Sequence, residues 1–481
     1  MNFENIKYIY FLGIGGIGMS ALARYFNAMG KFVSGYDKTK TSLTDELVAE
    51  GINVHFDDNV ELIPSDIRRL PAGQAGRSSD ILVVYTPAVP KDHSELKYFQ
   101  KNDYTIKKRS EVLGMITEQS FTIAVAGTHG KTTTSSLIAH ILKSSEVDCT
   151  AFLGGITQNY GTNLLLNEKL KTLKKKSKIK PITVVEADEY DRSFLTLHPD
   201  IAVITSLDAD HLDIYGDKDQ MEESYAQFAN QLKDGGVLVI KKGIDKVLVI
   251  EKKDKKILTY SLQQSSDYYA RKIAIKKGEY IFDMVTPEQA IRGMQLGIPG
   301  KHNIENAIAA VAVAQHMNVF SGNIKNALST FKGVKRRFEY QIKTEKLLYI
   351  DDYAHHPEEL RACISAVKEM YPSKRITGVF QPHLFTRTRD FADEFARSLE
   401  LLDELILLDI YPAREKSIEG ITSKMLLEKV RTKNKKLVLK TELVKELKDR
   451  EIEVLVTLGA GDIDTLIDPI KNELLKRIKK N

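Results

Sequence analysis

The stretch Ala124-Val-Ala-Gly127-Thr-His-Gly130-Lys131-Thr132-Thr-Thr-Ser135 joins an apolar run to a helical pattern. The run Phe121 to Ala126 stops at Gly127, and apolar residues recur at helical spacing from Leu137 to Leu142. A strand, a glycine turn and a helix in this order surround a phosphate chain with backbone N–H groups. We expect Lys131 to reach the outer phosphates and the Thr132 hydroxyl to bind Mg²⁺. The turn residues expected around the phosphates are Gly127, Thr128, His129, Gly130 and Thr133.

The turn departs from the strict phosphate-loop pattern at one position. That pattern has a glycine five residues before Gly130, where this chain has Val125. A glycine turn before a helix with a solvated lysine is therefore the alternative interpretation. The order of strand, turn and helix favours a nucleoside triphosphate site.

With 481 residues, the chain is long enough for a globular protein of two to four domains. Its net charge is only +5. This small charge does not favour nucleic acid as a partner. The sequence has no stretch of about 18 apolar residues, so we expect no membrane-spanning helix. We also expect no signal peptide. Cys149 and Cys363 lack metal spacing and are typical of core residues in the reducing cytoplasm, where we expect the protein.

Three blocks of alternating strands and helices predict an α/β protein with parallel sheets. We expect a Rossmann-like N-terminal domain at residues 1–108, a P-loop-type ATPase domain at 109–332, and a Rossmann-like C-terminal domain at 333–481. Between Gly236 and Tyr280 we expect a hairpin region of short strands. Two segments resemble insertions, a glycine-bearing loop at Pro71–Ser79 and a lysine run at Lys169–Lys180. The lysine run is typical of a solvated surface.

A second glycine turn, Gly13-Ile-Gly15-Gly16-Ile-Gly18, follows the first predicted strand, and Asp37 stands at the end of the next. This is the dinucleotide fingerprint, and taken alone it indicates NAD. Its physical basis is the close approach of a backbone to a diphosphate, which any nucleotide diphosphate satisfies. A dehydrogenase would leave the phosphate loop at Gly127–Thr133 without a purpose.

Acidic and polar residues follow the strands of the central block. Glu186 is the first acid after the predicted strand Ile182–Val185, and an acid beside a phosphate loop is suited to bind Mg²⁺. A solvated acidic turn is the alternative. His211, in an acidic loop after the next strand, could ligate a second metal or orient a phosphate, and a structural role is the alternative. Asn303, before an alanine-rich helix, either reads a base edge or caps that helix.

The third block carries two polar clusters at strand ends, where doubly wound sheets bind ligands. The first is Asp351-Asp-Tyr-Ala-His355-His356-Pro357, and the second runs from Gln381 to Asp390. The arginines of the second cluster suit a carboxylate or a phosphate. The histidines have no metal spacing, so we interpret them as hydrogen-bonding groups. Surface charge is the alternative for each cluster.

With these residues in view, the chain resembles the Mur ligases over nearly its whole length. The markers are Gly13–Ser20, Ala126–Thr133, Glu186–Glu189, His211–Asp213, Gly300–Asn303, Arg336–Glu339, Tyr353–Pro357 and His383–Arg389. The family implies a UDP-binding domain, a central ATPase and a C-terminal Rossmann-like domain. It further implies ATP and Mg²⁺ as cofactors and a carboxylate of a nucleotide sugar as the group that is activated.

The resemblance also implies roles for single residues. The residues assigned to the UDP-sugar are Gly15, Gly16, Ile17, Gly18, Asp37, Thr86 and Arg192. Lys131 and Thr132 would hold phosphates and Mg²⁺, with Glu186 and His211 as further metal ligands. His302 and Asn303 would contact adenine, and Arg337 and Asp352 would close on ATP. His356, Arg387 and Arg389 would position the amino acid or the transferred phosphate, with Lys131, His356 and Arg387 as the catalytic set.

One difference from several members of the family distinguishes between its branches. Several members that add later residues carry a carbamylated lysine downstream of the His-x-Asp segment, but Gln220–Gln231 contains no lysine. This favours the branch that joins L-alanine to UDP-N-acetylmuramate through an acyl phosphate, acting as a monomer or dimer. The alternatives are a ligase that attaches a preformed peptide to the same sugar nucleotide, a non-catalytic nucleotide sensor and, last, a dehydrogenase.

Overall fold

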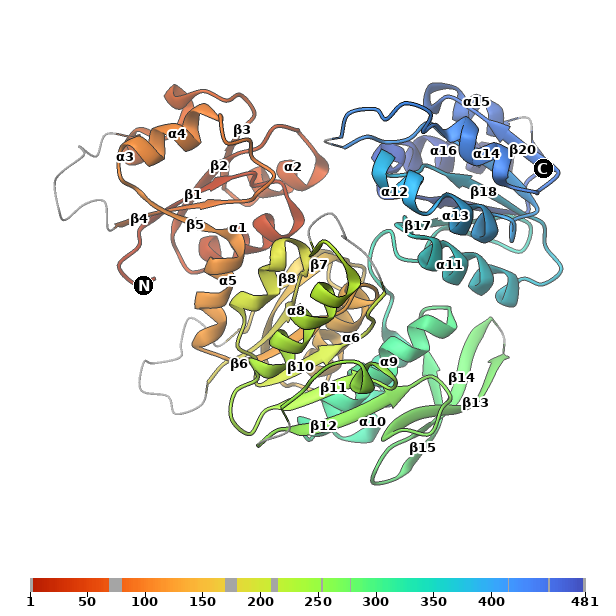
Figure 1. The fold of residues 1–481 in the computed structure, drawn as a ribbon, viewed down its shortest axis with the longest axis horizontal. Coiled ribbons are helices and arrows are strands. Elements are labelled where there is room, and N and C mark those ends of the chain that lie inside the picture. Colours follow the sequence, from red (N-terminus) through yellow and green to blue (C-terminus); the bar gives the residue numbers. More distant parts are fainter. Residues whose placement is uncertain are drawn as a thin grey trace. The chain divides into compact units, whose positions relative to one another are not determined.

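The computed structural model describes residues 3–68, 80–168, 180–208, 215–251, 254–276, 278–413, 415–448 and 450–478. The loop expected at Pro71–Ser79, the lysine run up to residue 179, and His211 lie outside these ranges. The chain, whose helices and strands are labelled in Figure 1, divides into two compact units. The first consists of residues 1–269, 284–291 and 306–328, and the second of residues 270–283, 292–305 and 329–481.

The N-terminal sheet is parallel throughout and has the strand order β3-β2-β1-β4-β5. Its strands are β1 (Tyr8–Leu12), β2 (Phe32–Tyr36), β3 (Asn53–His55), β4 (Ile81–Tyr85) and β5 (Thr105–Lys108). Its helices are α1 (Ile17–Ala28), α2 (Ser42–Ala49), α3 (Ser65–Arg68), α4 (Ser94–Lys101) and α5 (Arg109–Glu118). The apolar strands β1 and β4 are buried because helices cover a parallel sheet on both faces. The predicted Rossmann-like fold is confirmed.

The central sheet has the order β15-β14-β13-β12-β11-β10-β6-β9-β7-β8. Its strands are β6 (Phe121–Ala126), β7 (Cys149–Thr157), β8 (Thr162–Leu165), β9 (Ile182–Glu186), β10 (Ile201–Ile204), β11 (Val237–Lys241), β12 (Lys256–Ser261), β13 (Tyr268–Lys276), β14 (Glu279–Val285) and β15 (Ala290–Leu296). Its helices are α6 (Lys131–Ser144), α8 (Lys218–Asn230), α9 (Lys301–His316) and α10 (Ser321–Thr330). Strand β6, which leads into the phosphate loop, pairs in parallel with β9 and β10.

The expectation of a hairpin region from Gly236 to Tyr280 is wrong for the pairings of β11 with β12 and of β12 with β13. Strands β11 and β12 are parallel, and β12 is parallel to β13, so the sheet continues without reversal. The connection from β11 to β12 contains only a 3-10 turn, Ile244–Lys246, among its described residues. Without a helical pattern in the connection, the sequence lacked the usual sign of a parallel crossover.

The C-terminal sheet has the order β16-β17-β21-β18-β19-β20 and is parallel except for β16. Its strands are β16 (Glu339–Lys343), β17 (Leu348–Asp352), β18 (Ile376–Phe380), β19 (Glu404–Leu407), β20 (Asn434–Leu437) and β21 (Val454–Leu458). Its helices are α11 (Pro357–Met370), α12 (Phe385–Asp390), α13 (Ala392–Leu399), α14 (Ser423–Lys429), α15 (Leu443–Lys448) and α16 (Ile467–Ile478). Alternate residues of β17 enter two cores, Ile350 in one and Tyr349 in the other. The predicted doubly wound sheet is confirmed.

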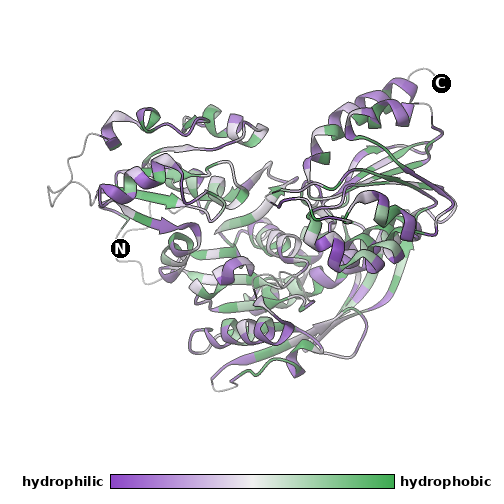
Figure 2. Ribbon diagram, turned by 45° about the horizontal axis from the view of Figure 1, so that its top comes forward, coloured by the Kyte–Doolittle hydropathy of each residue, from purple (hydrophilic) through white to green (hydrophobic). Residues whose placement is uncertain are grey.

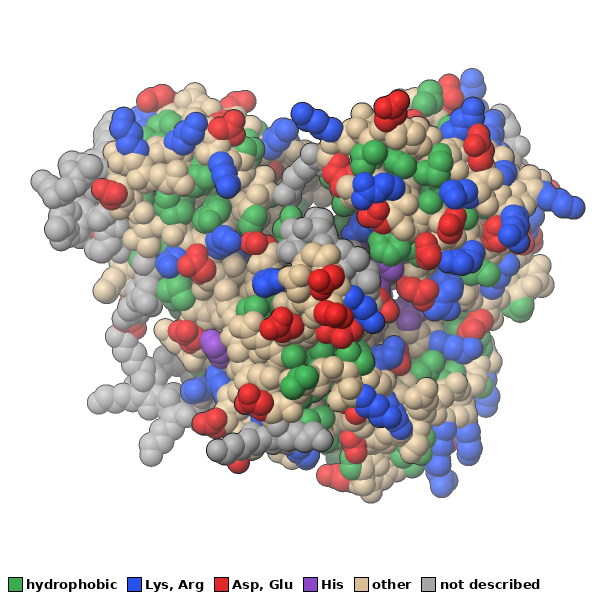
Figure 3. Space-filling model, viewed as in Figure 1, with side chains coloured by type: hydrophobic (Ala, Val, Ile, Leu, Met, Phe, Trp, Pro, Cys, Tyr) green, Lys and Arg blue, Asp and Glu red, His purple; other side chains and the backbone are tan. Residues whose placement is uncertain are grey.

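The N-terminal and central sheets of the first unit share one hydrophobic core. Leu22 and Phe26 of α1 belong to the same buried cluster as Phe152 of β7 and Leu164 of β8. Figure 2 shows the apolar strands enclosed by helices whose outer faces are hydrophilic. In Figure 3 acidic and basic side chains are interspersed over the visible face. Within the described ranges, no helix has the length and apolar character needed to cross a bilayer.

Candidate functional site

The turn between β6 and α6 requires glycine at two positions. Gly127 has a φ of +134° and Gly130 a φ of +81°, a region that L-residues with a Cβ rarely adopt. A Cβ at Gly127 would collide with the side chain of Thr205, and one at Gly130 would lie 2.5 Å from Oδ1 of Asn306. The predicted strand, turn and helix are therefore present, and the turn is closely enclosed.

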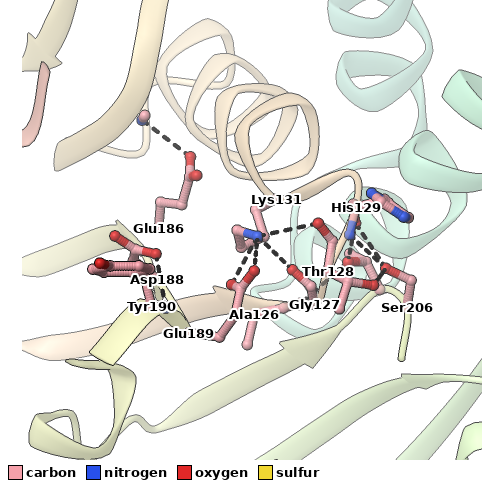
Figure 4. A network of polar contacts seen from close by, with 12 residues as sticks. Ala126, Gly127, Thr128, His129, Lys131, Glu186, Asp188, Glu189, Tyr190 and Ser206 are labelled. Atoms are coloured by element: carbon pink, nitrogen blue, oxygen red, sulfur yellow. Dashed lines mark hydrogen bonds and ion pairs between the residues drawn. The ribbon is translucent and has the colours of Figure 1, made fainter. Parts of the chain in front are cut away.

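Lys131, the first residue of α6, folds back over this turn (Figure 4). Its Nζ donates hydrogen bonds to the carbonyl oxygen of Gly127 at 2.6 Å and to that of Thr128 at 3.3 Å. The same ammonium pairs with the carboxylate of Glu189, with an Nζ–Oε1 distance of 2.8 Å. The lysine is thus held at the helix N-terminus, where an anion would meet both its charge and the free N–H groups.

Burial and charge act in opposite directions on this ion pair. Burial alone lowers the pKa of Lys131, but the carboxylates of Glu189 and Glu186 outweigh it, and the pKa lies above its usual value. Burial also raises the pKa of Glu189, which Lys131 offsets only in part. The lysine is therefore protonated at neutral pH and carries a full positive charge in the turn.

Glu186 and Thr132 form the pair of oxygen donors that the sequence predicts for Mg²⁺. The Thr132 hydroxyl donates to Oε1 of Glu186 at 3.1 Å, and Oε2 accepts from the backbone N–H of Gly154 at 3.1 Å. A hydroxyl and a carboxylate beside a phosphate loop suit the hard Mg²⁺ ion. Among the described residues, no group of three or more His, Cys, Asp and Glu side chains is arranged to hold a metal ion.

The end of β10 braces the phosphate turn from its other side. Ser206 Oγ accepts from the backbone N–H of His129 at 2.6 Å and lies 2.9 Å from the hydroxyl of Thr128. The imidazole Nε2 of His129 lies 3.7 Å from a carboxylate oxygen of Asp208. Thr133 is buried in the first turn of α6. These contacts fix the turn residues 127–130 before any phosphate binds.

The second glycine turn adopts the expected conformation after β1. The backbone N–H of Gly15 donates to Oδ2 of Asp37 at 2.7 Å, so Asp37 holds the turn as well as standing at the end of β2. A Cβ at Gly13 would lie 2.7 Å from Cγ2 of Thr86, and one at Gly18 would lie 2.9 Å from Nη1 of Arg109. Gly16 immediately precedes α1, whose first residue is Ile17. The predicted residues Gly15, Gly16, Ile17, Gly18, Asp37 and Thr86 are therefore brought together.

Arg192 lies in the segment after β9 that also carries Glu189. Its backbone N–H donates to the carbonyl oxygen of Glu189 at 3.0 Å, and its guanidinium lies 5.6 Å from the ring centre of Tyr215. Nearby in the chain, Asp188 pairs with Arg109 at 3.1 Å. Arg109, which approaches Gly18, thus connects the second glycine turn with the acidic segment.

In the second unit, four predicted ATP-site residues gather around the start of α9 and the end of β17. Burial lowers the pKa of His302 to about 4, with Arg337 acting in the same direction. Burial raises the pKa of Asp352 to about 6, although Arg337 opposes this shift. Asn303 is the third residue of α9 instead of its cap, and its amide donates to the carbonyl oxygen of Pro299 at 2.5 Å.

The residues of the second unit that are predicted to position the amino acid or the transferred phosphate lie in different surroundings. Arg387 is 7% exposed, and its Nη1 lies 3.5 Å from Nδ1 of His383. The ring of His355 contacts that of His383, with centroids 5.9 Å apart. His356 instead packs on Phe391, with ring centroids 5.0 Å apart. Arg389 pairs with its neighbour Asp390 at 2.7 Å and has a half-exposed side chain.

Several residues that complete these sites carry no role predicted from the sequence. They are Glu189 against Lys131, Asn306 against Gly130, Arg109 beside Gly18, and His383 beside Arg387. Glu189 and His383 stand inside motifs that the sequence singles out, so their position near a strand end was a usable signal. Asn306 and Arg109 carry no such signal because their partners are distant in the chain.

Profiles of known families match three successive parts of the chain. The catalytic domain of the Mur ligase family matches residues 8–121, the Mur ligase middle domain residues 125–314, and the Mur ligase glutamate ligase domain residues 336–463. Together with the fold and the phosphate loop, these matches define the class of the protein. The chain belongs to the Mur ligase family.

Individual relatives resemble the chain over its full length. A UDP-N-acetylmuramate–L-alanine ligase of Flavobacterium psychrophilum is 52% identical and covers 98% of this chain and 99% of its own. One of Parabacteroides distasonis is 50% identical over 100% of both chains. The crystal structure of the UDP-N-acetylmuramate–alanine ligase of Thermotoga maritima has a TM-score of 0.80 at 26% identity, covering 98% of this chain and 99% of that one. A murein peptide ligase of Psychrobacter arcticus shares the fold, with a TM-score of 0.70 at 21% identity over 97% of this chain and 98% of that one.

Proposed function

We propose that the protein joins L-alanine to the carboxylate of UDP-N-acetylmuramate with cleavage of ATP to ADP and phosphate. The observation that carries this proposal is full-length identity of about half with ligases of that name, on a chain that retains the phosphate loop. In such a reaction the muramyl carboxylate attacks the γ-phosphate in line and forms an acyl phosphate with release of ADP. The alanine amine then attacks the acyl carbon, phosphate leaves, and the amine loses a proton.

The residues of the first unit would supply charge and position for the first step. The ammonium of Lys131 would stabilise negative charge on the transferred phosphoryl group, because it is fixed and protonated beside the turn. The turn 127–130 and Thr133 would bind the triphosphate through backbone N–H groups. Gly15, Gly16, Ile17 and Gly18 would bind the diphosphate of the sugar nucleotide, with Asp37, Thr86 and Arg192 nearby.

Thr132 and Glu186 are the residues that would hold Mg²⁺, with His211 as a further proposed ligand. When bound, Mg²⁺ would neutralise charge on the phosphates. The hydrogen bond from Gly154 fixes the second oxygen of Glu186, which leaves Oε1 directed toward Thr132. These two side chains thus form a preorganised oxygen-donor pair.

The second unit would serve adenine and the incoming amino acid. We assign His302 and Asn303 to adenine, and Arg337 and Asp352 to ATP. His356 and Arg387 would contact L-alanine or the transferred phosphate. Arg389 would act only at the rim of that site, because its side chain is half-exposed and pairs with Asp390. The proton of the attacking amine needs an acceptor, for which we propose His356. The boundaries proposed for the three domains are 1–108, 109–332 and 333–481. With these boundaries, all strands of a given sheet fall within one domain.

We place the reaction in the cytoplasm, where ATP is supplied. Buried free thiols at Cys149 and Cys363 support a reducing compartment.

A phosphate-release assay with ATP, Mg²⁺ and UDP-N-acetylmuramate tests the proposed function. We expect phosphate to form with L-alanine and not with L-Ala-γ-D-Glu-meso-diaminopimelate. Mass spectrometry should find the sugar nucleotide extended by one alanyl residue. Turnover with the tripeptide alone would identify a peptide-recycling ligase, and absence of amino-acid-dependent ATP cleavage would indicate a nucleotide sensor.

A further inference from the structure

Asn163, on the edge strand β8 of the central sheet, connects that sheet to the helix of the diphosphate turn. Its side chain is fully buried. The amide Nδ2 donates to the carbonyl oxygen of Ile17 at 2.6 Å and to the hydroxyl of Ser20 at 3.0 Å. Both acceptors belong to the first turn of α1, directly after Gly16. Asn163 therefore holds the end of α1 that carries the glycine turn.

Arg24 completes the polar network from the side of α1. Its Nη1 donates to Oδ1 of Asn163 at 2.6 Å, which uses the remaining polar atom of the amide. The rest of the guanidinium pairs with Glu46 and Glu50, each 2.8 Å from Nη2. Asn163 and Arg24 are the buried members of this network, whereas the side chains of Glu46 and Glu50 are 40% exposed. Loss of either buried member leaves a buried polar atom of the other without its partner.

The strand pair that carries Asn163 also reaches the proposed metal ligand. Leu164, the next residue of β8, faces Phe152 of β7 across an antiparallel pairing. Gly154, two residues beyond Phe152, donates its backbone N–H to Oε2 of Glu186 at 3.1 Å. Strands β7 and β8 thus contact the first turn of α1 through Asn163 and the carboxylate of Glu186 through Gly154.

From these contacts we propose that Asn163 is a positioning residue of the ligase reaction. It fixes the first turn of α1, and with it the bound diphosphate, relative to Glu186 and the phosphate loop. The proposal rests on the proposed function, because in-line attack requires the sugar carboxylate to stay aligned with the γ-phosphate. Asn163 touches neither proposed ligand site directly, so its effect should fall on alignment and leave the affinity for each separate nucleotide intact.

The test is Asn163→Ala, studied by steady-state kinetics and by calorimetric binding of UDP alone. We expect kcat at saturating substrates to fall about tenfold to a hundredfold, since a small misplacement of reacting groups has this effect. We expect the Kd for UDP and the KM for ATP to stay within about twofold of the unmodified protein, because neither turn carries a substitution and both keep their backbone N–H groups. Arg24→Ala should lower kcat in the same direction, and the double variant should lose less than the product of the two effects.

Asn167→Ala is the matched control. Asn167 is also buried next to β8, but its amide donates to the carbonyl oxygen of Asp148 within the central part of the unit, at 3.3 Å. This variant should lower the melting temperature as Asn163→Ala does and keep kcat. Equal loss of kcat in both variants, an unchanged kcat in Asn163→Ala, or weakening of UDP binding in parallel with kcat would each overturn the positioning role.

Hydrogen exchange supplies a readout that does not depend on turnover. In the substrate-free protein, amides of residues 13–20 should exchange faster in Asn163→Ala than in Asn167→Ala. Equal exchange would contradict the anchoring itself. Failure of the proposed function has a different signature, because the unmodified protein would then prefer another acceptor. The kcat values of the two Asn variants can still be compared with that acceptor as the substrate, and their hydrogen exchange can be compared without any substrate.

Discussion

The Nζ atom of Lys131 lies 2.8 Å from both carboxylate oxygens of Glu189, and the two side chains are 14% and 3% exposed. The pair thus places a cation and its counterion largely out of water at the start of α6. Tyr215 donates its hydroxyl to the backbone carbonyl of Glu189 at 2.6 Å, which fixes the segment that carries the carboxylate. Glu189 is therefore the main counterion of Lys131.

Removal of only one member of this pair should destabilise the protein more than removal of both. Glu189→Ala leaves a buried ammonium without its counterion, and we expect the free energy of unfolding to fall by about 3 kcal/mol. Lys131→Met combined with Glu189→Leu should recover most of this loss. Urea denaturation of the single and double variants measures the difference. A single-variant loss below about 1 kcal/mol would mean that the pair behaves as an exposed one.

Glu186→Gln should raise the Mg²⁺ concentration needed for activity. The substitution keeps the hydrogen bond from Thr132 possible but removes the negative charge from the donor pair, and we expect the half-saturating Mg²⁺ concentration to rise at least about tenfold. The measurement is phosphate release against Mg²⁺ at fixed ATP. Asp191→Asn is the matched control, since Asp191 lies five residues further on and pairs with Lys108 at 2.9 Å. An equal Mg²⁺ requirement in both variants would exclude Glu186 as a ligand.

Gly130→Ala and Gly235→Ala separate backbone strain from crowding in the phosphate turn. Both glycines have a left-handed φ, +81° and +73°, but a Cβ at Gly130 meets Asn306 whereas one at Gly235 meets nothing within 4 Å. Each alanine should cost about 1–2 kcal/mol of stability through its backbone alone. Only Gly130→Ala should also raise the KM for ATP, because the turn must shift to admit the new methyl group. Similar KM values would show that Asn306 yields without cost.

The residues of the main site that stand at strand ends could be predicted from the sequence. The residues that reach the site through contacts between distant parts of the chain could not. Lys131, Thr132 and Glu186 follow from an apolar strand that stops at a glycine or an acid. Glu189 pairs with Lys131 across 58 positions of the chain, and the segment after it contains a left-handed φ at Asp191 and Arg192, 54° and 53°, where the sequence has neither glycine nor asparagine. The contact of Asn306 with Gly130 depends on how α9 packs, which local patterns do not encode.

The stability of the second unit should decrease on acidification because of His302. Burial lowers the pKa of this imidazole from 6.5 to about 4, so the folded protein binds fewer protons than the unfolded chain between these values. The contribution is fully present above pH 6.5 and is lost as the pH falls toward 4. It adds a slope of up to about 1.4 kcal/mol per pH unit, which His302→Gln should remove. Urea unfolding followed at several pH values measures it, and an unchanged slope would contradict a neutral buried imidazole.

Arg387 and Arg389 stand two residues apart on α12, and their surroundings predict a large loss of activity when Arg387 is removed and a small one when Arg389 is removed. Arg387 is 7% exposed and borders His383, whose pKa burial and Arg387 together lower to about 4. Its guanidinium therefore faces a neutral imidazole, and a planar guanidinium is the group that suits a carboxylate or phosphate. The Arg389 side chain is 51% exposed and pairs with Asp390.

We expect Arg387→Ala to lower kcat/KM for L-alanine about a hundredfold, as loss of a charged, desolvated contact does. Arg387→Lys should recover little of this, because an ammonium cannot reproduce the planar two-pronged contact. Arg389→Ala should change kcat/KM by less than about threefold, since exposed ion pairs contribute little. Comparable losses at both positions would reject the distinction and would place Arg389 at the substrate despite its exposure.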